Sequence, residues 1–182
     1  YKGGSSKIDS LIDIIEESIS NNHKILVFTS FKTALNTVKE KLDKKNITSY
    51  IIDGSVSSKK RMELVDSFNN DNTNVFLIML KSGGTGLNLT SADVVIHLDL
   101  WWNPAVENQA TDRAHRIGQK NVVSVIKLIT KGTIEEKILE LQEKKKILSD
   151  KLIDSGDMDS NILSSLTEKD IRNLLSYENK GE

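Results

Sequence analysis

Cysteine is absent from the sequence, which excludes a disulfide scaffold, a cysteine nucleophile and a zinc site built on thiolates. The three histidines are widely spaced, so a metal site made of histidine alone is not expected. No apolar run approaches the roughly 18 residues that a membrane-spanning helix needs, and no signal peptide is recognisable. These absences fit a reducing compartment and predict no membrane partner.

An excess of one charge is also missing. Lysine and arginine number 25, aspartate and glutamate 26, and the formal net charge is −1. A protein that binds nucleic acid over its whole surface would be strongly basic, so any site for a polyanion must be a local patch. The 182 residues, 37% of them hydrophobic, suit one domain with a small helical extension.

Short apolar runs alternate with segments of helical periodicity along most of the chain. This alternation predicts a parallel sheet with helices on both faces, whose ligands gather at the carboxyl ends of the strands. The expected strands are 24–31, 48–53, 74–80, 93–100 and 121–130, and the expected helices are 6–19, 32–45, 57–69, a helix opened by Asn103-Pro104, 133–153 and 165–175.

A glycine-rich loop, KSGGTG (81–86), follows the third expected strand. It is not a Walker A motif, because Leu87 stands where that motif requires lysine. The loop is either an ordinary turn or a cradle whose backbone N–H groups bind an anion. The sequence also lacks an acidic DExx motif, so the chain has no obvious means of holding a nucleotide–magnesium complex alone.

The stretch NQATDRAHRIGQK (108–120) places polar side chains at helical spacing. Positions i, i+3, i+4 and i+7 share one face of a helix, which usually carries apolar residues. Two arginines one turn apart could clamp phosphate oxygens while a carboxylate orients one guanidinium, although a solvated charged face is the alternative. The residues on this expected face are Gln109, Asp112, Arg113 and Arg116.

Other candidates have ordinary structural explanations. His115 is expected to pack or form hydrogen bonds, since no nucleophile stands near it in the sequence. Trp101 and Trp102 are adjacent at the end of a strand, where neighbours alternate faces, so at least one should be partly exposed. The lysine run 144–146 is expected on the solvent side of the long helix.

Together these segments resemble the second lobe of the Swi/Snf-type ATPases, which are superfamily-two, helicase-like DNA translocases. The resemblance covers roughly residues 6–175. KILVFTSF is similar to the family's fourth motif, and SGGTGLNL to the fifth. QATDRAHRIGQ is similar to the sixth motif and is the most specific match. Asp53-Gly54-Ser55, with Arg61 and Phe68, is similar to the segment after the fourth motif.

The resemblance implies a RecA-like fold of the P-loop NTPase type. Residues 1–132 would form the helicase C-terminal lobe, and 133–182 a helical brace extension. A separate N-terminal lobe of the parent protein would carry Walker A and the DExx box, and would hold ATP with Mg²⁺. The parent would be a DNA-dependent ATPase acting on duplex DNA, and this lobe alone would be inactive.

The resemblance also implies roles for individual residues. Arg116, with Arg113, would act as arginine fingers on the terminal phosphates of ATP. Gln109, Asp112, Gly86 and Asn88 would contact the nucleotide. The DNA contacts would come from Ser30, Lys32, Gly54, Arg61, Lys81, Ser82, Gly83, Gly84 and Trp102.

Two alternatives remain beside this interpretation. One is a DEAD-box RNA helicase lobe, whose sixth motif typically has glycine where Asp112 stands. The other is a non-catalytic module that binds nucleic acid or protein. Leu100 replaces an expected proline, and the WWNP form looks more like bacterial members. We therefore expect a cytoplasmic, nucleoid-associated bacterial protein, or a nuclear one if eukaryotic, and nothing indicates an obligate oligomer.

Overall fold

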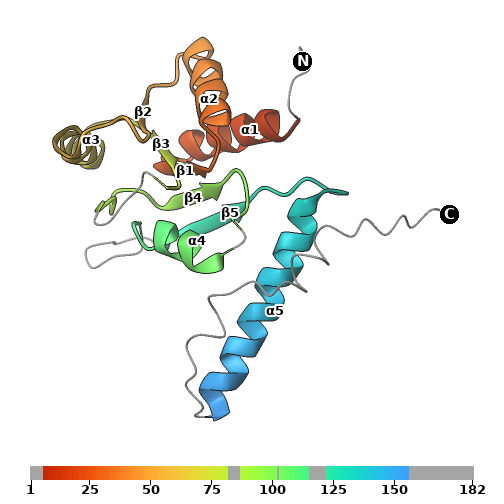
Figure 1. The fold of residues 1–182 in the computed structure, drawn as a ribbon. Helices are drawn as coiled ribbons and strands as arrows, with labels where there is room; N and C mark the ends of the chain where they lie inside the picture. The colour runs from red at the N-terminus through yellow and green to blue at the C-terminus, as the bar shows by residue number, and fades with distance from the viewer. Residues whose placement is uncertain (1–5, 82–86, 102, 115–121, 156–182) are drawn as a thin grey trace. The chain divides into compact units, whose positions relative to one another are not determined.

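The computed structural model describes residues 6–81, 87–101, 103–114 and 122–155 (Figure 1). The chain divides into two compact units. The first comprises Tyr1–Trp101 with Ala105–Ile129, and the second Trp102–Pro104 with Thr130–Glu182. In the part of the chain that the structure describes, no helix is both long and apolar enough to cross a membrane.

The first unit is built on a five-stranded parallel sheet in the order β2-β3-β1-β4-β5 (Figure 1). The central strand β1 pairs with β3 on one side and β4 on the other. The carboxyl ends of all five strands therefore meet at one edge of the sheet. The strands are β1 (Ile25–Thr29), β2 (Ser49–Ile52), β3 (Val75–Met79), β4 (Val94–His97) and β5 (Ser124–Lys127).

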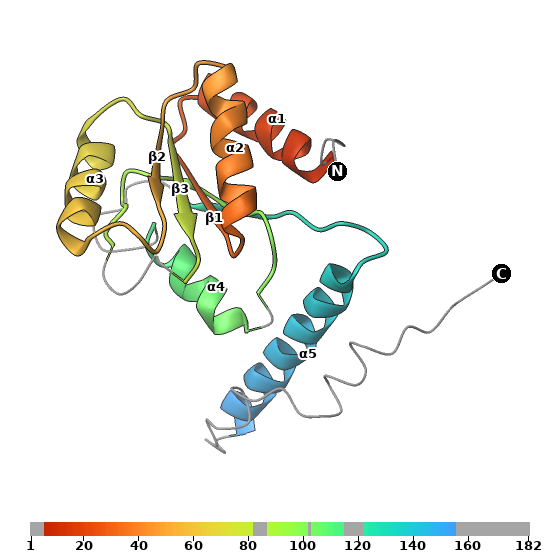
Figure 2. The same ribbon diagram turned by 45° about the horizontal axis from the view of Figure 1, so that its top comes forward.

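Two pairs of helices cover the two faces of this sheet. α1 (Ser6–Ser20) and α2 (Lys32–Lys44) lie next to each other and pack on one face (Figure 2). α3 (Ser58–Asn70) and the short α4 (Pro104–Thr111) pack on the other. The second unit contains α5 (Ile134–Ser155), preceded by a turn in which Gly132 has a positive φ of 71°.

Alternation along the strands explains the two-sided core. In β1, Ile25 and Val27 pack with α1 and α2, whereas Leu26 and Phe28 pack with α3 and α4. Every residue of β1 is buried, which is why its sequence is a continuous apolar run rather than an alternating one. β5 stands at the edge of the sheet, and its first two residues are exposed.

The predicted parallel sheet with helices on both faces is confirmed, and each expected strand is present but shorter. β5 spans four residues where ten were expected, because only Ser124–Lys127 pair with β4. Met62, within α3, lies on the solvent side of that helix, with 68% of its surface exposed. The helix expected at 165–175 and the lysine run's side chains lie outside the described residues.

Candidate functional site

The loop after β1 is fixed at the carboxyl edge by an aspartate that follows β4. The Ser30 N–H donates to both carboxylate oxygens of Asp99, at 3.0 Å each. The Thr29 hydroxyl donates to the same carboxylate at 2.5 Å and accepts from the Phe31 N–H at 3.2 Å. Asp99 therefore holds the segment that carries Ser30 and Lys32 in one conformation.

Lys32 links the loops after β1 and β2. Its ammonium lies 2.8 Å from Asp53 Oδ2, and its side chain remains 59% exposed. Hydrogen bonds from Lys32, and from the hydroxyl and N–H of Ser55, lower the pKa of Asp53 strongly despite an opposing effect of burial. Asp53 is thus an anion at the edge where Gly54 and Lys32 are expected to meet DNA.

Arg61 stabilises the turn that follows β2. Its Nε donates to the carbonyl of Val56 at 2.9 Å, and its Nη2 to the carbonyl of Asp53 at 3.4 Å. Two of the guanidinium N–H groups are therefore already hydrogen-bonded to backbone carbonyls. This geometry favours a role in shaping the turn at Gly54 over a full phosphate clamp.

Lys81 and Trp101 bring the loops after β3 and β4 together. The Lys81 ammonium lies over the Trp101 ring, 5.0 Å from its centroid, in a cation–π contact. Trp101 is partly buried against the core and partly exposed, as predicted for at least one of the two tryptophans. Lys81 itself is exposed at the edge of the sheet.

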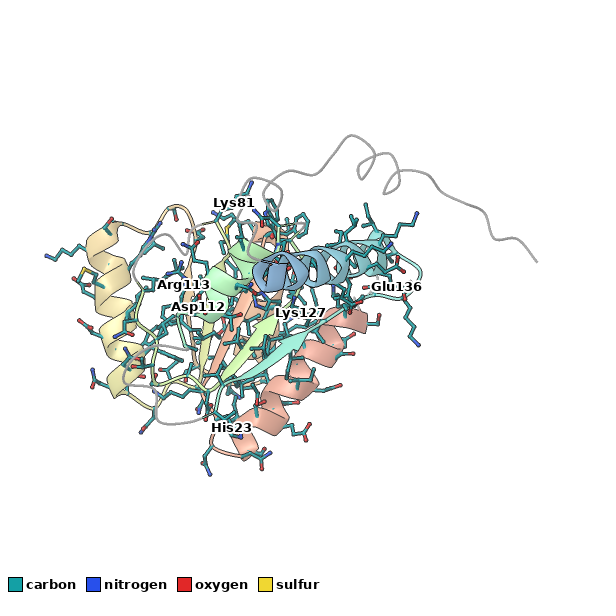
Figure 3. The ribbon with its side chains drawn as sticks, turned by 90° about the horizontal axis from the view of Figure 1, so that it is seen from below. His23, Lys81, Asp112, Arg113, Lys127 and Glu136 are labelled. Atoms are coloured by element: carbon teal, nitrogen blue, oxygen red, sulfur yellow. The ribbon has the colours of Figure 1, made fainter. Side chains whose placement is uncertain are left out.

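The polar helix face expected at Gln109, Asp112, Arg113 and Arg116 is wrong for the three of these residues that the structure describes, Gln109, Asp112 and Arg113. α4 ends at Thr111, and the next residues form a turn in which the Ala114 N–H donates to the Thr111 carbonyl at 3.0 Å. Gln109 and Asp112 are exposed, but Arg113 is buried, with 5% of its surface accessible. Figure 3 labels Asp112 and Arg113 next to each other. Asp112 and Arg113 lie beyond the end of α4, so they do not share a face of that helix with Gln109. Arg116 lies outside the described residues.

The segments of Asn88 and Arg113 are nevertheless adjacent. The Leu89 N–H donates to the Arg113 carbonyl at 3.1 Å. The side chain of Asn69, on α3, donates to the Asn88 carbonyl at 2.8 Å. Tertiary packing thus joins two of the stretches that carry the expected nucleotide contacts, although they are far apart in the sequence.

A family model described as the helicase conserved C-terminal domain matches residues 6–118. The chain belongs to this family. The match covers more than half of the 182 residues and includes every loop described above. The recognition of a RecA-like second helicase lobe from the sequence is thereby confirmed.

Relatives of this helicase domain are named as ATP-dependent helicases. A protein of Mycoplasma pneumoniae named "Uncharacterized ATP-dependent helicase" is 45% identical over 93% of this chain and 16% of its own length. The "Putative ATP-dependent helicase/translocase YwqA" of Bacillus subtilis is 42% identical over 96% of this chain and 18% of its own length. The chain therefore spans less than a fifth of these relatives.

Solved structures agree with this family. The Sulfolobus solfataricus SWI2/SNF2 ATPase core, solved in complex with double-stranded DNA, matches 93% of this chain and 35% of that chain. Its TM-score is 0.68 and its sequence identity is 39%. The C-terminal part of the Fun30 ATPase domain matches 75% of this chain and 45% of that chain, with a TM-score of 0.72 and 37% identity.

Three polar residues that organise this helicase domain were not selected from the sequence: Asp99, Glu107 and His97. Asp99 directly follows the buried core of a strand, at the carboxyl edge, and that position could have marked it. Glu107 lies on the side of α4 that faces the domain and is 1% exposed. Nothing in its sequence neighbourhood distinguishes a buried glutamate from an exposed one.

His97 is the last residue of β4 and is 1% exposed. Its ring stacks on Phe28 with centroids 5.6 Å apart, and its Nε2 lies 3.2 Å from the Thr111 hydroxyl. Burial lowers the pKa of His97, opposed by the negative charge of Glu107. His97 therefore connects α4 to the sheet as a neutral imidazole.

Several expected site residues lie outside the described residues of this helicase domain. They belong to the glycine-rich loop, the end of the Trp101–Trp102 pair, and the second half of the sixth-motif segment. They are Ser82, Gly83, Gly84, Gly86, Trp102 and Arg116, and His115, for which a structural role was expected, also lies outside the described residues.

Proposed function

We propose that this helicase domain is the second lobe of a DNA-dependent ATPase and translocase of the SWI/SNF kind. ATP would bind between this lobe and an N-terminal helicase lobe of the same parent protein. The observation that carries the proposal is the gathering of Ser30, Lys32, Gly54 and Lys81 at one sheet edge. The relatives' names as ATP-dependent helicases support it. Residues 1–132 would form the lobe, and 133–182 its brace.

The nucleotide side would depend on the segment that follows α4. Charge builds on the γ-phosphoryl group during hydrolysis, and an arginine supplied across a cleft stabilises that charge. We assign this role first to Arg116, because Arg113 is buried in the domain. Exposed Gln109 and Asp112, with Asn88 and Gly86, would contact the nucleotide, while the N-terminal lobe would hold Mg²⁺.

The DNA side would use the loops at the carboxyl edge. Contacts to phosphate oxygens position a protein on a duplex without reading its sequence, as a translocase requires. Lys32 and Lys81 would supply positive charge. Ser30, Gly54 and residues 82–84 would supply backbone or hydroxyl hydrogen-bond donors. Trp102 would supply a flat apolar surface. Arg61 would act mainly by holding the turn at Gly54. Closure of the lobes on ATP would move these contacts relative to those of the other lobe.

The test is the ATPase rate of the full-length parent with and without duplex DNA. Wild type, Arg116→Ala and Arg116→Lys are compared with Lys44→Ala, which removes an exposed positive charge on α2. We expect strong stimulation by DNA in wild type and Lys44→Ala. Arg116→Ala should lose about 10³-fold in the stimulated rate, the scale of an arginine finger. Lys cannot reproduce the planar fork, so Arg116→Lys should recover little.

Equal rates in all variants would reject the arginine finger. Stimulation by RNA with none by duplex DNA would instead indicate an RNA helicase. No ATP turnover under any condition would favour a non-catalytic binding module.

A further inference from the structure

Glu107 is a buried carboxylate with two cross-links to other elements of the first unit. It lies on α4 and is 1% exposed. Its Oε1 accepts the Trp101 N–H at 2.6 Å, and its Oε2 forms an ion pair with the ammonium of Lys127 at 2.7 Å. Trp101 follows β4, and Lys127 is the last residue of β5. One side chain therefore ties α4 to the ends of two strands.

This arrangement fixes geometry rather than adding much stability. The Glu107 carboxylate is buried, whereas the Lys127 side chain is 32% exposed. Burying a charge costs about as much as its attraction to a partner returns, so such pairs are weak evidence for stability. A short hydrogen bond from a backbone N–H to a buried carboxylate does, however, allow little movement between its two partners. The position of the Trp101 backbone and the position of α4 are thus tied to each other.

On one side, this link leads to the proposed DNA contacts. The ring of Trp101 carries the Lys81 ammonium at 5.0 Å from its centroid. Lys81 is the first residue of the glycine-rich loop, and Trp101 directly precedes Trp102. A duplex that engages this edge would therefore act on the backbone that Glu107 holds.

On the other side, the link leads to the proposed nucleotide contacts. α4 is only eight residues long and ends at Thr111, one turn after Glu107. The next residue, Asp112, is exposed. Arg113 after it is buried, and its carbonyl accepts the Leu89 N–H. A helix this short moves as one rigid piece, so a shift at Glu107 is passed to the segment that leads to Arg116.

We infer that Glu107 is a positioning residue that couples duplex binding at Lys81 and Trp101 to the nucleotide-facing end of α4. The inference rests on the proposed function. The interaction that would transmit the coupling is the hydrogen bond from the Trp101 N–H to Glu107. Lys127 orients the carboxylate that accepts this bond.

Two double variants of the full-length parent test this hydrogen bond directly. Glu107→Gln/Lys127→Met and Glu107→Met/Lys127→Met both remove the ion pair and leave the net charge unchanged. Replacing a buried pair by side chains of similar volume is often tolerated, so both should fold. They differ in one respect: only Gln keeps an acceptor for the Trp101 N–H. ATPase is measured without DNA and over a range of duplex concentrations.

We expect the Gln-containing variant to keep DNA stimulation within about twofold of wild type. The Met-containing variant should lose roughly fivefold or more in maximal stimulation, within the range for residues in a coupling network. Its rate without DNA should stay near that of wild type, a split that a purely structural defect would not give. Equal stimulation in the two variants, or a proportional loss of both rates, would overturn the inference.

Hydrogen–deuterium exchange of the wild-type parent gives a second measurement that needs no variant. Saturation with duplex DNA should slow exchange at residues 98–101 and also at 105–114. Slowing confined to 98–101 would overturn the coupling. A wild-type ATPase that does not respond to DNA would instead refute the proposed function, which keeps the two failures distinguishable.

Discussion

At the scale of single residues, buried and half-buried polar side chains organise this domain more than the exposed charges do. Asp99 fixes the loop after β1, Glu107 fixes the loop after β4, and His97 connects α4 to the sheet. Arg113 is buried as well. Buried polar groups must be hydrogen-bonded or paired, so each of them defines the position of a backbone segment.

His97 gives a prediction for stability against pH. Burial lowers its pKa below the ordinary value of 6.5, so below that pH the unfolded chain binds a proton that the folded chain resists. The contribution of His97 to the free energy of unfolding should therefore be complete above pH 6.5. It should be lost progressively as the pH falls below that value. The loss from this group is at most about 1.4 kcal/mol per pH unit. His97→Gln should reduce the slope.

Urea unfolding of the 182-residue chain at pH 7.5 and pH 5.5 measures this slope for wild type and His97→Gln. The ring nitrogen Nδ1 has no hydrogen-bond partner among the described residues, so protonation would add a buried donor without an acceptor. An identical pH dependence in the two proteins would mean that other groups account for the acid destabilisation.

At the scale of elements, the loops after β1 and β2 act together through Lys32 and Asp53. The ion pair joins the first residue of α2 to the loop after β2. It places one negative charge among the proposed DNA contacts. The two partners should therefore influence DNA binding in opposite directions.

We predict that Lys32→Ala weakens binding of the parent to duplex DNA, because it removes a cation and leaves the Asp53 carboxylate unpaired. Asp53→Asn should strengthen binding, because Lys32 then faces phosphate without a competing anion. The slope of log affinity against log salt should become shallower by about one for Lys32→Ala. Fluorescence anisotropy with labelled duplex at several salt concentrations measures both effects.

Glu40→Gln is the matched control for Asp53→Asn, since it removes one exposed negative charge from α2. It should change affinity little. Equal strengthening by Glu40→Gln would show that overall charge, rather than the ion pair at the sheet edge, controls DNA binding.

At the scale of the whole molecule, the domain covers only part of the proteins it resembles. It spans 16% of the Mycoplasma pneumoniae relative and 35% of the Sulfolobus solfataricus ATPase core. In the proposed function, catalysis needs groups from both lobes, since this sequence contains no Walker A motif to hold the nucleotide. The domain alone should therefore behave as an incomplete site.

We predict that the purified 182-residue chain hydrolyses no ATP and binds duplex DNA weakly, with affinity that falls steeply as salt rises. Few phosphate contacts belong to this lobe, and each contributes mainly through release of counterions. A coupled-enzyme ATPase assay and anisotropy titrations at two salt concentrations test this. Turnover by the isolated chain, or tight binding that depends on DNA sequence, would contradict the prediction.

The sequence alone determined the family and the order of the elements. A short, mostly apolar run such as Ile25–Thr29 predicts a strand that is buried on both faces. Alternation of such runs with amphipathic helices predicts a parallel sheet covered by helices. The start of α4 at Pro104 was also predictable, because proline is preorganised for the first helical turn. The glycine-rich and sixth-motif stretches identified the helicase lobe from local residue types.

Only the tertiary structure decided which polar residues are buried and where α4 ends. Helical spacing cannot show that α4 stops at Thr111, because the turn beyond it depends on the backbone bond from Leu89 to Arg113. Nor can it show that Glu107 meets the Trp101 N–H and Lys127, since those partners come from strands placed by the sheet order. Local patterns are governed by short-range sterics and periodicity, whereas burial and pairing depend on contacts between distant segments.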